Sequence, residues 1–291
     1  MRAGITPEVG RHAEAVIQKY STSYALAARL FPTDIREATY VLYAFFRESD
    51  DLVDTGEQSS ARGRIDEREK HWLDVYEGKA ADDGIIGAAA LVFHEFGIPY
   101  QVATDFFAAM RRDTEKRGYE TRAELYVYAR GAAGTVGIAM AHVIGYKGDE
   151  ALVYADKMGA AVQVTNILRD ICEDYDELGR IYIPAVDLER YSVTEDEIRN
   201  HQVTPAFKYL MHDLVAYNRS LYAEAVSGIE LLNRRGRLPV RLAVQISLGT
   251  LAAIDRNEYD IFTKRARVPT WKKGALLLSA AASEGLARLR F

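Results

Sequence analysis

Apolar residues recur at every third or fourth position along most of the chain, as in Val41, Leu42 and Phe45. This spacing is typical of α-helices that turn one face toward a core, and strand-like alternation is scarce. The helical pattern pauses at the prolines, because proline favours first turns and connections between helices. They stand at Pro7, Pro32, Pro99, Pro184, Pro205, Pro239 and Pro269. The pattern therefore predicts a chain of successive helices.

Signals for helix starts agree with the hydrophobic pattern. Residues 32–34, 82–84 and 192–195 each place capping or turn residues ahead of a helical segment. The chain has no internal repeat, low-complexity tract or long linker. These features predict an all-α fold with about ten helices packed around a central space. We expect a single helical domain over residues 1–291.

Composition narrows the class of protein. The chain is 48% hydrophobic and 27% charged, and its net charge is only −5, so we expect no nucleic-acid partner. Cys172 is the only cysteine, which excludes an internal disulfide and suits a reducing cytosol. The first residues lack a signal-peptide core, and no apolar stretch reaches the roughly 18 residues that cross a bilayer. We expect a cytoplasmic protein.

Two polar segments stand out at the ends of apolar stretches: RESDDLVD at residues 47–54 and QVTNILRDICED at residues 163–174. Residues four apart share one face of a helix. Asp50 and Asp54 therefore form one polar stripe, and a second stripe is formed by Asn166, Asp170 and Asp174. Carboxylates at this spacing repel each other, and more strongly when they are partly buried. The arrangement favours a bound cation.

The ligand chemistry of the two stripes points to metal and diphosphate. Hard oxygen ligands suit Mg²⁺, which fills its remaining positions with water and phosphate oxygens. Arg47 and Arg169 lie beside the acids, and guanidinium groups bind phosphate oxygens through paired hydrogen bonds. A single DDxxD string is more often a solvated helix end without a ligand. Two such stripes, each with an arginine, favour a metal–diphosphate site instead.

Five segments together resemble the squalene/phytoene synthase family, the head-to-head prenyl synthases: SYALAARLFP, YAFFRESDDLVD, YARGAAGTVG, QVTNILRDICEDYDELGRIYIP and YDIFTKRARV. The resemblance extends over residues 20–268. It implies an isoprenoid synthase fold in which two aspartate-rich helices face each other across a central cavity. They would hold Mg²⁺, with Mn²⁺ as an alternative, and the diphosphates of two prenyl substrates.

The resemblance also implies roles for individual residues. The implied metal ligands are Asp50, Asp51, Asp54, Asn166, Asp170 and Asp174. The implied catalytic residues are Asp50, Asp54, Asp170, Asp174 and Tyr128. The implied substrate-binding residues are Ser21, Ser23, Tyr24, Tyr43, Arg47, Gln163, Arg169 and Arg265. One position departs from the family, which often carries a tyrosine where Ser247 aligns.

The implied activity is the condensation of two geranylgeranyl diphosphates to phytoene, through a cyclopropylcarbinyl diphosphate, for carotenoid biosynthesis. A nearer alternative is a dehydrosqualene or squalene synthase that uses two farnesyl diphosphates, with NADPH required only for squalene. An alternative of another class is a non-catalytic helical assembly factor with the same fold. Such a factor would have eroded acid motifs, whereas both motifs are intact in this chain.

Four further features bear on the site, and three of them leave alternatives open. Gly131, Gly134 and Gly137 indicate either close helix packing or a channel for a prenyl tail. Residues 179–184, GRIYIP, form either a lid over the diphosphates or a plain connection. The six histidines show no pair at metal-ligand spacing, so we predict no zinc site. The C-terminal segment predicts a final packed helix, with peripheral membrane contact during product release as the alternative.

Overall fold

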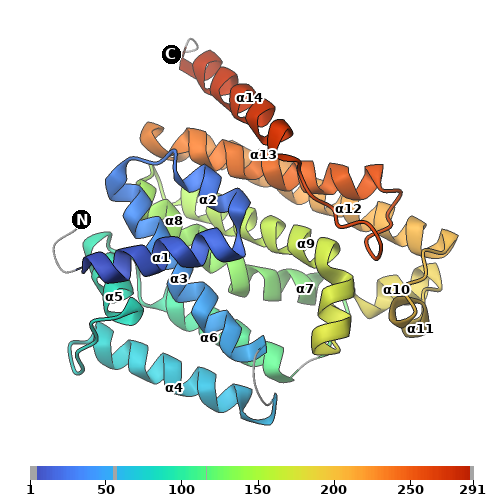
Figure 1. The fold of residues 1–291 in the computed structure, drawn as a ribbon, viewed down its shortest axis with the longest axis horizontal. Helices are drawn as coiled ribbons and strands as arrows, with labels where there is room; N and C mark the ends of the chain where they lie inside the picture. Colours follow the sequence, from blue (N-terminus) through green and yellow to red (C-terminus); the bar gives the residue numbers. More distant parts are fainter. Residues whose placement is uncertain (1–4, 55–57, 116, 289–291) are drawn as a thin grey trace.

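Helices make up the fold of the described residues, 5–54, 58–115 and 117–288, in this computed structural model (Figure 1). The first half contains α1 (Pro7–Tyr20), α2 (Thr22–Ala28), α3 (Thr33–Asp54), α4 (Gln58–Tyr76), α5 (Ile85–Glu95), α6 (Gln101–Glu115), α7 (Arg122–Ala129), the π-turn η1 (Arg130–Gly134) and α8 (Thr135–Ile144). The second half contains α9 (Glu150–Leu178), α10 (Ala185–Tyr191), α11 (Glu195–Arg199), α12 (Pro205–Ala225), the 3₁₀ turn η2 (Val226–Leu231), α13 (Arg234–Arg256) and α14 (Thr270–Arg288). The all-α prediction is confirmed.

Side-chain caps start six of the α-helices in the described residues. The Thr6 hydroxyl accepts a hydrogen bond from the backbone of Val9 at 3.3 Å, and a proline occupies the first turn of α1. Thr194 and Glu197 form a reciprocal capping box at the start of α11. The prediction that every proline marks a pause is wrong at Pro239, which lies inside α13. Pro239 is the sixth residue of α13, in its second turn, so its missing backbone donor removes one hydrogen bond between successive turns of the helix.

The helix α3 turns from core to polar cavity within a few residues. Phe45 is fully buried, with its ring centre 4.8 Å from that of Trp72 on α4 and 6.3 Å from that of Phe93 on α5. Such aromatic packing holds the middle of α3 in place. The buried middle of α3 therefore fixes the position of its acid-rich last turns, which lie at the polar cavity.

The long helix α9 runs through the middle of the molecule and packs against α8, η1, α12 and α13 (Figure 1). Its backbone leaves helical geometry at Asp170, where φ is −106° and ψ is 15°. The segment beyond this kink runs in a different direction and ends at Gly179, whose φ of 63° suits the left-handed helix cap.

The glycines of η1 and α8 allow a close approach to α9. A Cβ atom on Gly137 would lie 2.2 Å from the carbonyl oxygen of Ala155, and one on Gly159 would lie 2.0 Å from that of Ala133. Neither position has room for a side chain, so the packing explanation for the glycine run is confirmed. Gly137 also lines the apolar cavity described below.

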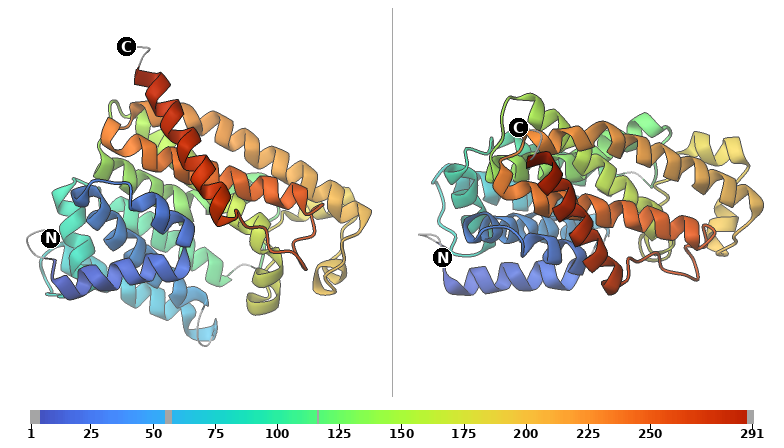
Figure 2. Two further views of the ribbon diagram at one scale, coloured as in Figure 1. Left: turned by 45° about the horizontal axis from the view of Figure 1, so that its top comes forward. Right: turned by 90° about the horizontal axis from the view of Figure 1, so that it is seen from above.

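Two segments are long and apolar enough to cross a membrane by length and composition, which the sequence reading did not anticipate: Arg122–Ile144 and Arg234–Arg256. In their most apolar windows, 44% and 50% of the residues are buried inside the protein. Core helices pass the same test of length and composition, and α13 contributes buried residues along its whole length. Near the C-terminus, α14 lies across the outer side of α13 (Figure 2).

Candidate active site

A polar cavity has a volume of about 190 Å³. The C-terminal ends of α3 and α6 lie on one side of it, and the kinked part of α9 and the start of the α9–α10 connection lie on the other. Most residues that the sequence assigned to the site line this cavity. They are Arg47, Asp50, Asp54, Tyr128, Gln163, Asn166, Arg169, Asp170 and Asp174. The two polar stripes, more than a hundred residues apart in the chain, therefore meet across one space.

The first stripe is crowded with like charge. Arg47 Nη1 lies 3.1 Å from Asp50 Oδ2, and its other nitrogen pairs with Asp51. Burial, together with the charge of Asp54, raises the pKa of Asp50 to about 7. Asp50 therefore holds a proton more readily than an exposed carboxyl does when no cation is bound.

The second stripe has the same electrostatic character. Burial and the neighbouring charges of Asp170 and Asp54 raise the pKa of Asp174 to about 8. Arg169 donates from Nε to Asp170 Oδ1 at 2.7 Å and also pairs with the other carboxylate oxygen. These two hydrogen bonds from the Arg169 guanidinium hold the Asp170 carboxylate at the kink of α9, beside the cavity.

The sequence reading missed three residues at the cavity: Asp113 and Tyr182, which line it, and Arg180, which lies behind them. Arg180 is almost fully buried and donates from Nη1 to Asp54 Oδ1 at 2.8 Å and to Asp113 Oδ2 at 2.9 Å. Tyr182 donates to the same Asp113 oxygen at 2.7 Å. Arg180 and Tyr182 belong to the quoted GRIYIP block, but only the fold shows that they point inward. Asp113 on α6 carried no motif, so no signal in the sequence marked it.

The GRIYIP connection is fastened at several points along residues 117–120. The backbone of Ile181 donates to the carbonyl of Arg117 at 2.9 Å, and that of Ala185 donates to Tyr119 at 2.9 Å. With Arg180 buried beneath it, the segment forms a fixed wall of the polar cavity in this structure. Its interpretation as a lid remains a prediction.

An apolar cavity of about 350 Å³ adjoins the polar one. Four residues line both cavities and so mark their junction: Arg47, Asp50, Gln163 and Asn166. Small side chains dominate the rest of its wall, and Tyr24 and Tyr43 stand near the junction. Burial raises the pKa of both tyrosines, so their hydroxyls stay protonated and can act as hydrogen-bond donors.

Asp51, which pairs with Arg47, and three predicted substrate-binding residues lie outside the lining of both cavities. Ser21 caps α2 by accepting a hydrogen bond from the backbone of Tyr24 at 3.2 Å, and Ser23 is half-buried on the same helix. Arg265 reaches the second stripe from outside, where Nη2 lies 3.8 Å from Asp170 Oδ1 and Nη1 pairs with Glu173. Their substrate-binding roles remain predictions.

Ser247 takes part in a buried polar chain. The hydroxyl oxygens of Tyr24 and Ser247 are 3.4 Å apart, and the hydroxyl of Tyr222 also bonds to Ser247. Tyr222 lies 2.9 Å from Thr165 on α9, through their hydroxyl oxygens. Tyr24 lines the apolar cavity, and Ser247 and Tyr222 support its hydroxyl from behind.

The donors in the polar cavity fit a divalent cation. Carboxylate and amide oxygens from two helices converge there, and the raised pKa values of Asp50 and Asp174 reflect negative charge that lacks a full counter-charge. Within the described chain, Asp113 Oδ1 and Arg180 Nη2 are buried without a hydrogen-bond partner. Such groups are rare in protein interiors and suit a bound ion or ligand.

Known proteins resemble this chain over most of its length. The family model for squalene/phytoene synthase matches residues 17–272. A 15-cis-phytoene synthase from Synechocystis is 32% identical over 89% of this chain and 80% of its own length. A phytoene synthase from Arthrospira platensis is 33% identical over 89% of this chain and 87% of its own.

Solved structures show the same architecture. A dehydrosqualene synthase, crystallised with a ligand, has a TM-score of 0.88 at 29% identity and covers 95% of this chain and 96% of its own. A squalene synthase from Alicyclobacillus acidocaldarius has a TM-score of 0.76 at 27% identity, covering 88% of this chain and 98% of its own. The fold is therefore the isoprenoid synthase fold, as expected. The chain belongs to the squalene/phytoene synthase family of prenyltransferases.

Proposed function

We propose that this protein condenses two geranylgeranyl diphosphates to phytoene, as a step of carotenoid biosynthesis. The observation that carries the proposal is the junction of an acid- and arginine-lined cavity with a long apolar one. The two spaces match the diphosphate and the hydrocarbon tail of a prenyl substrate. Phytoene synthases among the relatives support the choice of product. Family membership brings prenyl diphosphate substrates and dependence on a divalent metal.

The polar cavity would bind and activate the leaving group. Mg²⁺, with Mn²⁺ as an alternative, would be held by Asp50, Asp54, Asn166, Asp170 and Asp174, with Asp51 as an accessory acid. When bound, the metal supplies positive charge that stabilises the departing diphosphate. Guanidinium groups of the site add fixed donors for the phosphate oxygens.

The apolar cavity would hold the hydrocarbon tail and protect the cation. Its wall follows α9 from Ala151 to Asn166, a stretch of roughly 22 Å of helix. Exclusion of water prevents the allylic cation from being captured before the second substrate's double bond attacks it. The cation formed by this attack loses a proton as the cyclopropane ring closes, which gives the cyclopropylcarbinyl diphosphate. That intermediate loses its own diphosphate, rearranges and releases a second proton to give phytoene. No reduction occurs on the way to phytoene, so NADPH is not required.

A product assay tests this proposal. Purified protein with Mg²⁺ receives geranylgeranyl or farnesyl diphosphate separately, with and without NADPH, and the extracted hydrocarbon is identified by mass. We expect phytoene from the twenty-carbon substrate, independent of NADPH. Absence of hydrocarbon from both substrates would overturn the enzymatic proposal and favour a non-catalytic helical factor.

The second candidate is a dehydrosqualene synthase acting on two farnesyl diphosphates. It is favoured by the structural match to a dehydrosqualene synthase, with its TM-score of 0.88. The same assay separates the two, because this candidate gives a thirty-carbon product from the fifteen-carbon substrate and little from the longer one.

Peripheral membrane contact would give the hydrocarbon product an exit. Trp271 is 76% exposed and Leu278 is 73% exposed, and both belong to α14. This helix lies on the outer side of α13 (Figure 2). Exposed aromatic and aliphatic side chains on one helix suit the interface of a bilayer. Co-sedimentation with phospholipid vesicles tests this contact. The double variant Trp271→Ser, Leu278→Ser should reduce the fraction of protein bound to vesicles. Tyr209→Ser, which removes an exposed aromatic side chain on α12, is the control.

A further inference from the structure

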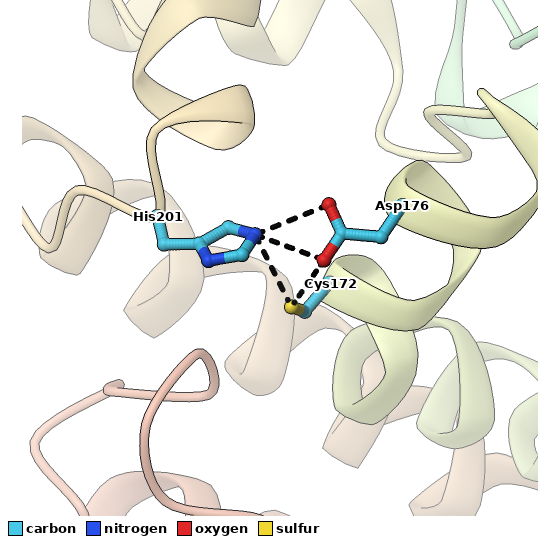
Figure 3. Close-up of side chains that lie close together, drawn as sticks. All are labelled: Cys172, Asp176 and His201. Carbon is cyan, nitrogen blue, oxygen red and sulfur yellow. Dashed lines mark hydrogen bonds and ion pairs between the residues drawn. The ribbon is translucent and has the colours of Figure 1, made fainter.

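Cys172, Asp176 and His201 bring three different metal-binding side chains together outside the polar cavity (Figure 3). Cys172 and Asp176 lie one helical turn apart on the segment of α9 beyond the kink. His201 comes from the turn after α11. Sequence spacing gave no sign of this cluster, because the histidine is 29 residues from the cysteine. The absence of histidine pairs thus did not exclude a site that combines three residue types.

The distances within the cluster are close to those of a tetrahedral zinc site. Cys172 Sγ lies 3.4 Å from Asp176 Oδ2 and 3.5 Å from His201 Nε2. His201 Nε2 lies 3.0 Å from the nearer Asp176 oxygen. Zinc bonds of about 2.0 to 2.3 Å to N, O and S place such ligands about 3.4 to 3.6 Å apart. Only the imidazole–carboxylate distance must widen, by roughly 0.4 Å.

The position of His201 is held by an unusual backbone. Its φ is 53°, in the left-handed region that favours glycine at the end of a helix. The backbone of His201 donates to Ile198 at 3.0 Å, and its ring stacks on Phe262 with centres 5.3 Å apart. The imidazole is therefore directed at Cys172 by groups outside the cluster.

The ligand set and its surroundings select the metal. Thiolate, imidazole and carboxylate suit Zn²⁺, whereas Mg²⁺ prefers oxygen ligands alone. The side chains of Asp176 and His201 are 44% and 41% exposed, so a fourth position is open to water. Burial and the adjacent Asp176 raise the pKa of the Cys172 thiol to about 11, so its proton must be displaced by the metal.

We propose that Cys172, Asp176 and His201 bind a zinc ion with water in the fourth position. Two residues along a helix correspond to a rotation of about 200°, so these ligands face away from the cavity that Asp170 and Asp174 line. Zinc would tether the rear of the Asp174-bearing segment to the turn after α11. The site is separate from the metal proposed for the polar cavity and does not depend on the proposed function.

Cobalt spectroscopy tests the site directly, because Cys172 is the only thiol in the chain. The full-length protein is freed of metal, saturated with Mg²⁺ to fill oxygen-ligand sites, and titrated with Co²⁺. We expect thiolate-to-cobalt charge-transfer absorption that saturates at a single equivalent and is abolished by Zn²⁺. Cys172→Ala should remove the absorption, and Asp176→Asn should weaken Co²⁺ binding at least tenfold.

His201→Gly separates metal binding from folding. Glycine suits the left-handed backbone, so the metal-free variant should unfold at the same temperature as the native protein or higher, while it loses the stabilisation that Zn²⁺ gives. His212→Ala, an exposed histidine on α12, is the matched control and should keep both signals. The proposal would be overturned if the charge-transfer band were absent or persisted in His201→Gly. It would also be overturned if the band appeared only when two copies of the protein shared one cobalt ion through their two thiolates.

Discussion

Arg180 donates to Asp54 at 2.8 Å, although the two residues are 126 positions apart. The same guanidinium binds Asp113, so one buried cation connects α3 and α6 to the connection after α9. Burial alone would lower the pKa of Arg180. The charges of Asp113 and Asp54 outweigh this effect and raise the pKa above its ordinary value. The first acid motif is thus held in place by a residue that follows the second.

Arg180→Met should destabilise the protein, because it leaves Asp113 buried without its counter-charge. Breaking a buried ion pair from one side typically costs about 3–5 kcal/mol. Denaturant unfolding at pH 7 measures the loss. Arg199→Met is the control, since all the partners of Arg199, namely Glu195, Asp196 and Tyr175, bind it at the exposed surface. A loss as small as that of the control would contradict a structural role for the Arg180 pairs.

Asp54→Ala and Asp170→Ala should each abolish turnover while the helical circular dichroism stays unchanged. Both carboxylates line the polar cavity, and loss of a preorganised charge contact typically costs about 10²–10³ in rate. Hydrocarbon formation with Mg²⁺ provides the readout, and Asp196→Ala on the exposed face of α11 is the control. Full activity in either variant would remove the metal assignment.

The all-α fold and most of the polar cavity could be predicted because helical periodicity and acid spacing are local properties of the sequence. Arg180 shows what could not be predicted. Its inward direction follows from the anchoring of residues 181 and 185 to 117 and 119, a long-range pairing with no sequence pattern. His201 shows the same limit, since its distance from Cys172 depends on how α11 packs against α9.

Cavity shape was likewise beyond the sequence. Phe45, Val136 and Leu168 could not be ranked as residues that set substrate length. In the structure Val136 lines the apolar cavity, whereas Phe45 and Leu168 are buried in the core. All three are apolar residues on helices, so only the packing of those helices separates a cavity wall from a filled interior.

The stability of the metal-free protein should fall as the pH rises from about 4 to about 8. The folded state holds protons on Asp50 and Asp174, whose pKa values of about 7 and about 8 lie above the ordinary 3.8. Between these values the unfolded chain binds fewer protons, so the free energy of unfolding decreases with pH. Melting temperatures measured in EDTA from pH 5 to 8 test this. The slope of melting temperature against pH should be negative.

Asp174→Asn should flatten that slope and raise the melting temperature of the metal-free protein at pH 8 by several degrees. The amide keeps the shape of the carboxyl but cannot ionise, so the repulsion from Asp170 and Asp54 disappears. Excess Mg²⁺ should stabilise the native protein more than the variant. An unchanged slope in Asp174→Asn would show that the raised pKa does not govern stability.

Ala141→Phe should shift substrate preference from twenty to fifteen carbons. Ala141 lies near the C-terminal end of α8 and lines the apolar cavity far along the helix from the polar junction, so a ring there shortens the space for the tail. Ala141→Val should give a smaller shift in the same direction, which distinguishes shortening from misfolding. Competition between the two diphosphates, with products separated by mass, measures the ratio, and Ala129→Val on α7, buried outside both cavities, is the control. A shortened cavity should still admit the shorter chain. If the Phe variant melts like the native protein but loses both products equally, this end of the cavity does not hold the tail.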